Sequence, residues 1–129
     1  MDYLDPKIWN PVKQVCALAA QLVESAVRKE GASVILPLLS RFSTKRDLLR
    51  VQLQALSDAV RDLILLKKSD DAPLSFYPDR EHAIDLCDRA ALPFLYEWSD
   101  AIRKALDENA RNANVRLCLT KMALSARIL

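Results

Sequence analysis

The chain has 129 residues, of which 51% are hydrophobic and 28% are charged. This length fits one domain, and the balance of apolar and charged residues is that of an ordinary globular domain, which excludes a disordered chain. The 19 basic and 17 acidic residues are interspersed along the sequence and leave a formal net charge of +2. That pattern lacks the concentrated basic face that nonspecific DNA binding requires.

The first half of the sequence predicts two helices. Asn10 followed by Pro11 is typical of a helix start, and Gly31 is typical of a helix end. The apolar segment Ser33–Leu39 contains Pro37, which predicts a short or kinked second helix. Apolar residues recur at spacings of three and four in the first helix: Val12, Val15, Cys16, Ala19, Leu22, Val23 and Ala26.

The longest predicted helix runs from about Thr44 to about Lys68. Thr44 and Asp47 form a pair like a capping box, with Asp in place of the usual Glu. The basic residues at the end of this helix suit its negative dipole end. The prolines and acidic residues that follow predict a loop over Ser69–Pro78. Leucines and a valine repeat at heptad spacing along the inward face: Leu49, Leu53, Leu56, Val60 and Leu63.

Three more helices follow in the second half. Asp79 is the expected N-cap of a fourth helix through about Ala91, and Pro93 the start of a fifth. The last helix is expected from about Asn114 to the C-terminus. Because apolar and polar residues nowhere alternate over a sustained run, no strand is predicted. The predicted fold is an all-α single bundle of five to six helices over residues 1–129. The inward residues of the fourth and fifth helices are Ala83, Ile84, Leu86, Cys87, Ala90, Leu95, Trp98, Ile102, Ala105 and Leu106.

Composition also limits the chemistry and the location. A single glycine, Gly31, is too few for a phosphate-binding loop or a dinucleotide fold. The three cysteines, Cys16, Cys87 and Cys118, are widely spaced among apolar neighbours. This pattern favours reduced thiols packed in the core of a cytoplasmic protein over disulfides. No window is long and apolar enough for a membrane span, and the N-terminus lacks the features of a signal peptide.

Candidate catalytic side chains are few. His82 lies beside Glu81 and Asp85, and Asp88 follows on the same predicted helix. Metal binding or acid–base catalysis needs further partners that the sequence does not show, so a surface or capping histidine is favoured. Trp98 falls on an apolar stripe, which favours core packing over stacking on nucleic-acid bases. We therefore expect no catalytic, cofactor-binding or metal-binding residues, and hence no enzyme.

Two features indicate contact with another protein. Arg61 and Asp62 interrupt the apolar run Val60–Leu66. They form either a solvated edge of the helix or a polar contact with a partner, and their spacing alone does not favour one interpretation over the other. The last helix is apolar on two sides, which means full burial in its own bundle or partial burial in a partner. Its position at the chain end favours the partner. One stripe comprises Val115, Leu119, Met122, Ala126 and Leu129; the other comprises Leu117, Leu124 and Ile128.

Two stretches resemble a known family. The first is VRDLILLK, Val60 to Lys67, and the second is LDENARNANVRLCLTKMAL, Leu106 to Leu124. Together they resemble the C-terminal collar domain of the delta-prime subunit of bacterial DNA polymerase III, a clamp-loader subunit. The Arg-Asp-Leu run also occurs in the related gamma/tau subunits, so it identifies a collar better than it identifies the subunit. The family joins its last two helices through an Asn-rich segment, here Asn109, Asn112 and Asn114, where Asn112 or Asn114 is a natural N-cap.

The resemblance implies a non-catalytic assembly domain in DNA replication. In such clamp loaders, five collars pack into a ring that holds the ATPase modules together while the sliding clamp is placed on DNA. The expected partners are the delta and gamma/tau subunits, and DNA is contacted only indirectly, through the assembled loader. Because the chain lacks the nucleotide loop, the zinc-binding cysteines and the Ser-Arg-Cys motif of the family's N-terminal half, we expect a C-terminal fragment. In that case Met1–Asn10 is partly linker.

In this interpretation the interface candidates are Arg61, Asp62, Leu117, Leu124 and Ile128. The alternatives are a gamma/tau collar and an unrelated helical interaction scaffold. A nucleic-acid-binding module is disfavoured by the mixed charge, and an enzyme is the least favoured.

Overall fold

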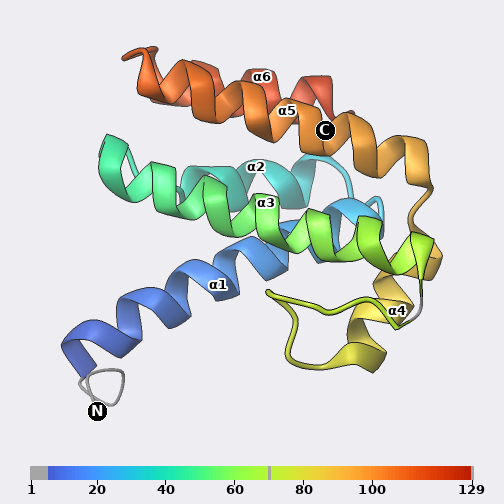
Figure 1. Cartoon of the computed structure of the whole chain (residues 1–129). Helices are drawn as coiled ribbons and strands as arrows, with labels where there is room; N and C mark the ends of the chain where they lie inside the picture. The colour runs from blue at the N-terminus through green and yellow to red at the C-terminus, as the bar shows by residue number, and fades with distance from the viewer. Residues whose placement is uncertain (1–5, 70, 129) are drawn as a thin grey trace.

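The fold is a bundle of α-helices, which confirms the predicted all-α class (Figure 1). The computed structural model describes residues 6–69 and 71–128, with side chains from residue 13 onward. Within these residues there are six helices and no strand. Their bounds are α1 Pro6–Val27, α2 Ala32–Ser40, α3 Arg46–Lys68, α4 Arg80–Arg89, α5 Leu92–Ala110 and α6 Val115–Ser125.

The central element is α3, which packs against α1, α4 and α5. Figure 1 shows α3 running through the middle of the molecule, with α5 and α6 on one side and α1 on the other. The heptad stripe predicted for this helix is confirmed as its core face, because all five of its members are fully buried. They are Leu49, Leu53, Leu56, Val60 and Leu63.

The start of α1 differs from the prediction. The helix begins at Pro6, so Asn10 and Pro11 lie inside it and do not form its N-terminal cap. Pro6 satisfies the same preference for proline at the first helical position, five residues earlier. Of the expected linker Met1–Asn10, the last five residues are therefore helical, and residues 1–5 lie outside the described part of the chain.

The end of α1 also differs. The helix stops at Val27, and the left-handed residue after it is Lys29, with φ 56°, where Gly31 was expected. The backbone N–H of Lys29 donates to the carbonyl of Ala26, and that of Glu30 donates to Ser25, which is the Schellman arrangement of a helix C-terminus.

The same arrangement ends two more helices. Asn112, with φ 65°, follows α5, and Arg127, with φ 59°, follows α6. The N–H of Ala113 donates to the carbonyl of Glu108, and the N–H of Ile128 donates to the carbonyl of Ala123. Non-glycine residues therefore hold all three left-handed C-terminal positions. The expected continuation of the last helix to the chain end is wrong, because α6 stops at Ser125; Leu129 lies outside the described residues.

The remaining boundaries follow the predictions with one exception. Asp79 caps α4 by accepting hydrogen bonds from the N–H groups of Glu81 and His82, and α2 is a short helix that contains a proline. At α3, however, Lys45 occupies the N-cap position and no side chain caps the helix, so the Thr44 capping box is absent. The preceding loop is held instead by Gln52, whose side-chain oxygen accepts from the N–H of Ser43 at 2.8 Å.

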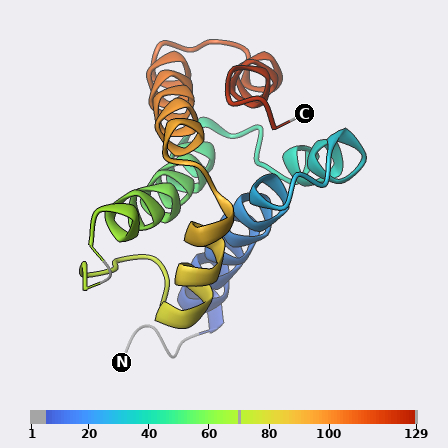
Figure 2. The same cartoon turned by 90° about the vertical axis from the view of Figure 1, so that its right-hand side faces the viewer.

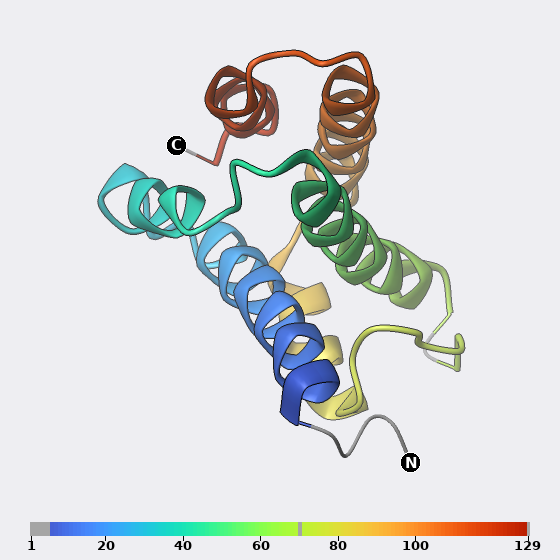
Figure 3. The ribbon, with the colours of Figure 1, turned by 90° about the vertical axis from the view of Figure 1, so that its left-hand side faces the viewer.

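Two helices lie close to the last described residues. The two side views place α2 and α6 on the same side of the bundle, with the described segment that follows α6 between them (Figures 2 and 3). A small cavity of about 130 Å³ opens between these helices and is lined by Leu36 and Leu39 from α2 and by Arg116 and Leu119 from α6.

Gly31 has a backbone conformation that favours glycine, and replacing it measures the free-energy cost of a side chain at this position. Its φ of 87° and ψ of −179° belong to a region that essentially only glycine occupies, and a Cβ added there meets no atom within 4 Å. We expect Gly31→Ala to lower the free energy of unfolding by about 1–3 kcal/mol through backbone strain alone. Lys29→Gly should raise it by about 1 kcal/mol, because glycine removes the cost of the left-handed residue. Urea unfolding followed by circular dichroism measures both; equal stabilities would show that the backbone relaxes freely.

Candidate functional site

Asp62 is a fully buried acidic residue with several hydrogen-bond partners. Its side chain is fully buried in α3 and accepts from the backbone N–H groups of Ser75, Phe76 and Tyr77 at 3.0, 2.8 and 3.0 Å. The hydroxyl of Ser75 donates to the same carboxylate at 3.3 Å. These bonds attach the loop between α3 and α4 to the central helix, since they satisfy backbone donors that burial would otherwise leave unpaired.

The expectation that Asp62 contacts a partner does not fit this position. All of its described hydrogen bonds are internal, and none of its surface is exposed. Its neighbour Arg61 is exposed, and none of the ion pairs found among the described residues includes it. Asp62 therefore fits neither of the two interpretations that spacing left open, a solvated helix edge or a polar contact with a partner, because it holds an internal loop. Arg61 faces solvent and stays a candidate for a contact with a partner.

Asparagines build the joint between α5 and α6, although each has a different task. Asn114 caps α6 by accepting the N–H of Leu117 at 3.0 Å, while Asn112 adopts the left-handed conformation that ends α5. Asn109 is buried and connects to the start of α3: its side-chain amide donates to the carbonyl of Arg46 at 3.1 Å. The guanidinium of Arg46 donates to the Asn109 carbonyl at 3.0 Å.

The last helix exposes two leucines on its outer side. Leu117 and Leu124 keep 59% and 60% of their surface accessible, whereas Leu119 and Met122 on the opposite side are buried. The expected second stripe is wrong in one member, because Ile128 lies beyond the end of α6 and is buried at 6% exposure. A left-handed residue precedes Ile128 and turns the chain back toward the core, which a helical projection does not anticipate.

The candidate histidine and its acidic neighbours lie on the surface of α4. His82 lies on the surface in the first turn of α4, as predicted, and Asp85 forms an ion pair with Arg89 at 3.2 Å. No group of three or more potential ligands in this part of the chain converges on a metal site. Trp98 is fully buried, as predicted.

The three cysteines, Cys16, Cys87 and Cys118, are free thiols. Cys87 and Cys118 are buried, but Cys16 is exposed, which corrects the expectation that all three are packed in the core. Partial burial, followed by the charge of Asp58, raises the pKa of the Cys16 thiol. Burial and then Glu108 raise the pKa of Cys118. Raised values keep both thiols protonated and therefore poorly reactive.

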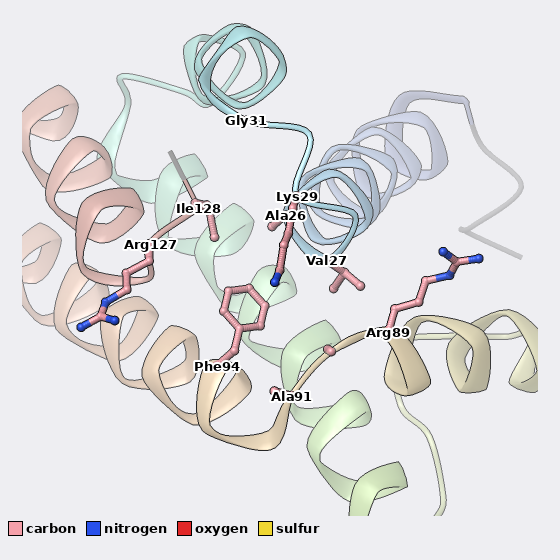
Figure 4. Close-up of a pocket in the computed structure, with 10 residues that line it drawn as sticks. Ala26, Val27, Lys29, Gly31, Arg89, Ala91, Phe94, Arg127 and Ile128 are labelled. Atoms are coloured by element: carbon pink, nitrogen blue, oxygen red, sulfur yellow. The ribbon is translucent and has the colours of Figure 1, made fainter.

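Among the described residues, a cavity lies where the ends of α1, α4 and α6 meet the starts of α2 and α5, and no sequence pattern indicated it. Its volume is about 440 Å³, and three basic residues, Lys29, Arg89 and Arg127, line it (Figure 4). None of its described lining residues is acidic. The cavity is lined by Ala26, Val27, Lys29, Gly31, Arg89, Ala90, Ala91, Phe94, Arg127 and Ile128.

Two buried polar atoms of the described residues have no hydrogen-bond partner. They are the hydroxyl of Tyr77 and the indole nitrogen of Trp98. Burial raises the pKa of Tyr77, and the nearby charges of Asp62 and Glu24 raise it further. The fold therefore holds this phenol in its neutral form, because ionising it would place a buried negative charge near the carboxylates of Asp62 and Glu24.

The comparisons with known proteins add no relative. No family model, no curated protein and no solved structure matches the chain. None of the described helices is both long and apolar enough to cross a membrane. The site is therefore interpreted from its own geometry.

Asp62 should be essential for stability. Asp62→Ala leaves three backbone N–H groups without their acceptor, so we expect a loss of about 3 kcal/mol or more in the free energy of unfolding. Asp62→Asn keeps one acceptor oxygen and should lose less. The matched control is Asp58→Asn on the same helix, whose side chain bonds only to exposed Gln54, and it should change stability by less than about 0.5 kcal/mol. Equal losses in Asp62→Ala and the control would contradict the assignment.

Tyr77 should make the fold sensitive to alkali. Because its pKa is raised in the folded state, its contribution to stability is complete below the ordinary tyrosine pKa of about 10 and is lost as the pH rises above it. Tyr77→Phe removes this loss and also removes an unpaired buried hydroxyl, so stability at neutral pH should be unchanged or higher. Urea unfolding at about pH 8 and about pH 11 measures the difference. Tyr96→Phe, at the surface, is the control, and an unchanged alkaline loss in Tyr77→Phe would exclude this cause.

Proposed function

We propose that this chain is a non-catalytic assembly domain, the collar of a bacterial clamp-loader subunit of the delta-prime type. Its task is to hold neighbouring subunits in register during the loading of the sliding clamp. The observation that carries the proposal is the outer face of α6, where Leu117 and Leu124 are both well exposed. The resemblance of the joint and terminal helix to delta-prime collars supports the choice of partner.

The two leucines form one contact surface. They stand seven residues apart, which places them on the same side of the helix about two turns apart. Between them lie Thr120 and Lys121, both exposed, so polar groups border the apolar contact. Covering the two leucines would contribute about 1–2 kcal/mol each, because more than half of each side chain is still accessible.

Arg61 supplies the polar part of the proposal. It is exposed on α3 and lies outside the ion pairs of the described residues, so its charge is available to a neighbouring subunit. Exposed pairs contribute little energy, but they select the partner and its orientation. The interface role assigned to Arg61 remains part of the proposal, whereas Asp62 and Ile128 serve the interior.

The test is assembly with clamp-loader subunits. We expect the chain, mixed with the delta and gamma/tau subunits of its own organism, to form a complex that survives moderate salt in size exclusion with light scattering. Leu117→Gln/Leu124→Gln should weaken that complex at least on the order of tenfold, since two apolar contacts are lost. Arg61→Glu should weaken it while leaving the helix content unchanged.

Matched variants control for nonspecific effects. Leu48 and Val51 are exposed on α3 by 41% and 45%, so Leu48→Gln/Val51→Gln removes a similar apolar pair from a different surface. Arg50→Glu is the control for Arg61, because both residues lie on the solvent side of α3. Capture by gamma/tau in the delta-prime position would favour the gamma/tau alternative. Elution of the chain alone in every mixture would contradict the proposal, and self-association that depends on the two leucines would indicate a different helical scaffold.

A further inference from the structure

α2 is a helix without charged residues. None of its nine residues, Ala32–Ser40, carries a charge, and it packs closely on α1. Figures 2 and 3 show it beside α6, standing out from the rest of the bundle. A helix that has no charged face is normally buried on all sides. Leu36, however, keeps 49% of its surface accessible, so one side of α2 has no neighbour within the described chain.

The cavity between α2 and α6 is a groove with apolar walls. The two hydroxyl groups in its lining are used within their own helices: Ser40 donates to the carbonyl of Pro37 at 2.7 Å, and Thr120 donates to the carbonyl of Arg116 at 2.9 Å. Neither hydroxyl hydrogen is therefore left for a polar ligand. The apolar lining of the groove comprises Leu36, Leu39 and Leu119.

The size of the groove selects a single side chain. Its volume of about 130 Å³ is smaller than the roughly 300–1,000 Å³ of pockets that take small-molecule ligands. It is close to the volume of about 150 Å³ in which an apolar cavity holds one benzene-sized group. A leucine or phenylalanine side chain therefore fits the groove, whereas a cofactor does not.

The groove continues the outer surface of α6. Thr120 lines the groove and lies between Leu117 and Leu124 in the sequence, so one protein surface can cover both regions. With Leu36, three leucines about half exposed present at most about 400 Å², since even a large aromatic side chain buries only about 150–250 Å². Each partner in a stable two-chain interface buries roughly 800 Å². The surface therefore suits a contact that other contacts in a multi-subunit assembly reinforce.

The charges beside the groove disfavour a second copy of the chain. Arg116 lines the groove, and neither α2 nor α6 contains an acidic residue. A symmetric dimer through this surface would bring two copies of Arg116 into one interface, without an acidic group on either helix to offset them. The occupant is therefore a different chain.

We propose that the groove between α2 and α6 receives one apolar side chain from a helix of the neighbouring clamp-loader subunit. Insertion of an apolar anchor from a helix into a groove is a common way for helical surfaces to recognise each other. The inference rests on the proposed assembly function and adds α2 to a contact that otherwise involves α6 and Arg61.

The test is the affinity of the complete chain for the delta and gamma/tau subunits, measured by bio-layer interferometry. Leu36→Gln removes an exposed apolar wall and should weaken binding at least about fivefold. Ser40→Phe fills the groove from within and should weaken binding by a similar factor, although it adds apolar surface. Because both residues are exposed, the circular dichroism spectra of both variants should match that of the unaltered chain.

Two variants on α3 are the matched controls. Leu48→Gln removes a leucine that is 41% exposed, and Gln54→Phe adds an aromatic ring at an exposed position. Both should bind like the unaltered chain. Equal weakening by the controls would mean that binding does not depend on the groove, and tighter binding of Ser40→Phe would mean that the surface adheres to apolar groups without insertion. Either result overturns the proposal.

The failure of this inference differs from the failure of the proposed function. A complex that Leu117→Gln/Leu124→Gln weakens, and that neither Leu36→Gln nor Ser40→Phe affects, would overturn insertion into the groove and leave the assembly function in place. Absence of any complex would contradict both. Self-association that Leu36→Gln abolishes would assign the groove to a second copy, and binding to phosphatidylglycerol vesicles that the same variant abolishes would assign it to a lipid surface; both outcomes overturn the proposal.

Discussion

The burial of α3 is the constraint on which the rest of the structure depends. Its buried face is apolar except for Gln52 and Asp62, and it is covered by α1, α4 and α5. These three helices pack on different sides of α3, so they bury little surface against one another. Two of their ends are therefore held by hydrogen bonds to α3. Asp62, at the edge of this face, fixes one of them: it holds the loop that leads into α4. Arg46 and Asn109 fix another, where the start of α3 meets the end of α5.

Turns in this chain are made almost without glycine, and this has a structural consequence. The one glycine, Gly31, lies directly before α2 in a backbone conformation that disfavours any residue with a side chain. The left-handed helix ends fall instead to Lys29, Asn112 and Arg127. Where glycine would have ended these helices without a side chain, two of them place a cation beside the same cavity. The scarcity of glycine and the presence of two basic residues at this cavity are therefore connected.

The sequence predicted the helices and their core faces, because apolar spacing depends only on which side of a helix is buried. The heptad of α3, the caps Asp79 and Asn114 and the buried Trp98 were all foreseeable in this way. The fate of Asp62 was not, since spacing cannot show that a loop thirteen residues later supplies three donors. Ile128 was misplaced for a related reason: a helical projection assumes that the helix continues, and the left-handed Arg127 ends it.

The end of α6 connects the outer face of that helix to the core. Its outer face carries Leu117 and Leu124, while Arg127, which follows the helix, lines the cavity at the helix ends. Since Ile128 is buried directly after Arg127, the end of α6 is anchored to the core and its direction is fixed. The two outer leucines are therefore held on a preformed surface, and a subunit that covers them does not have to order the helix on binding.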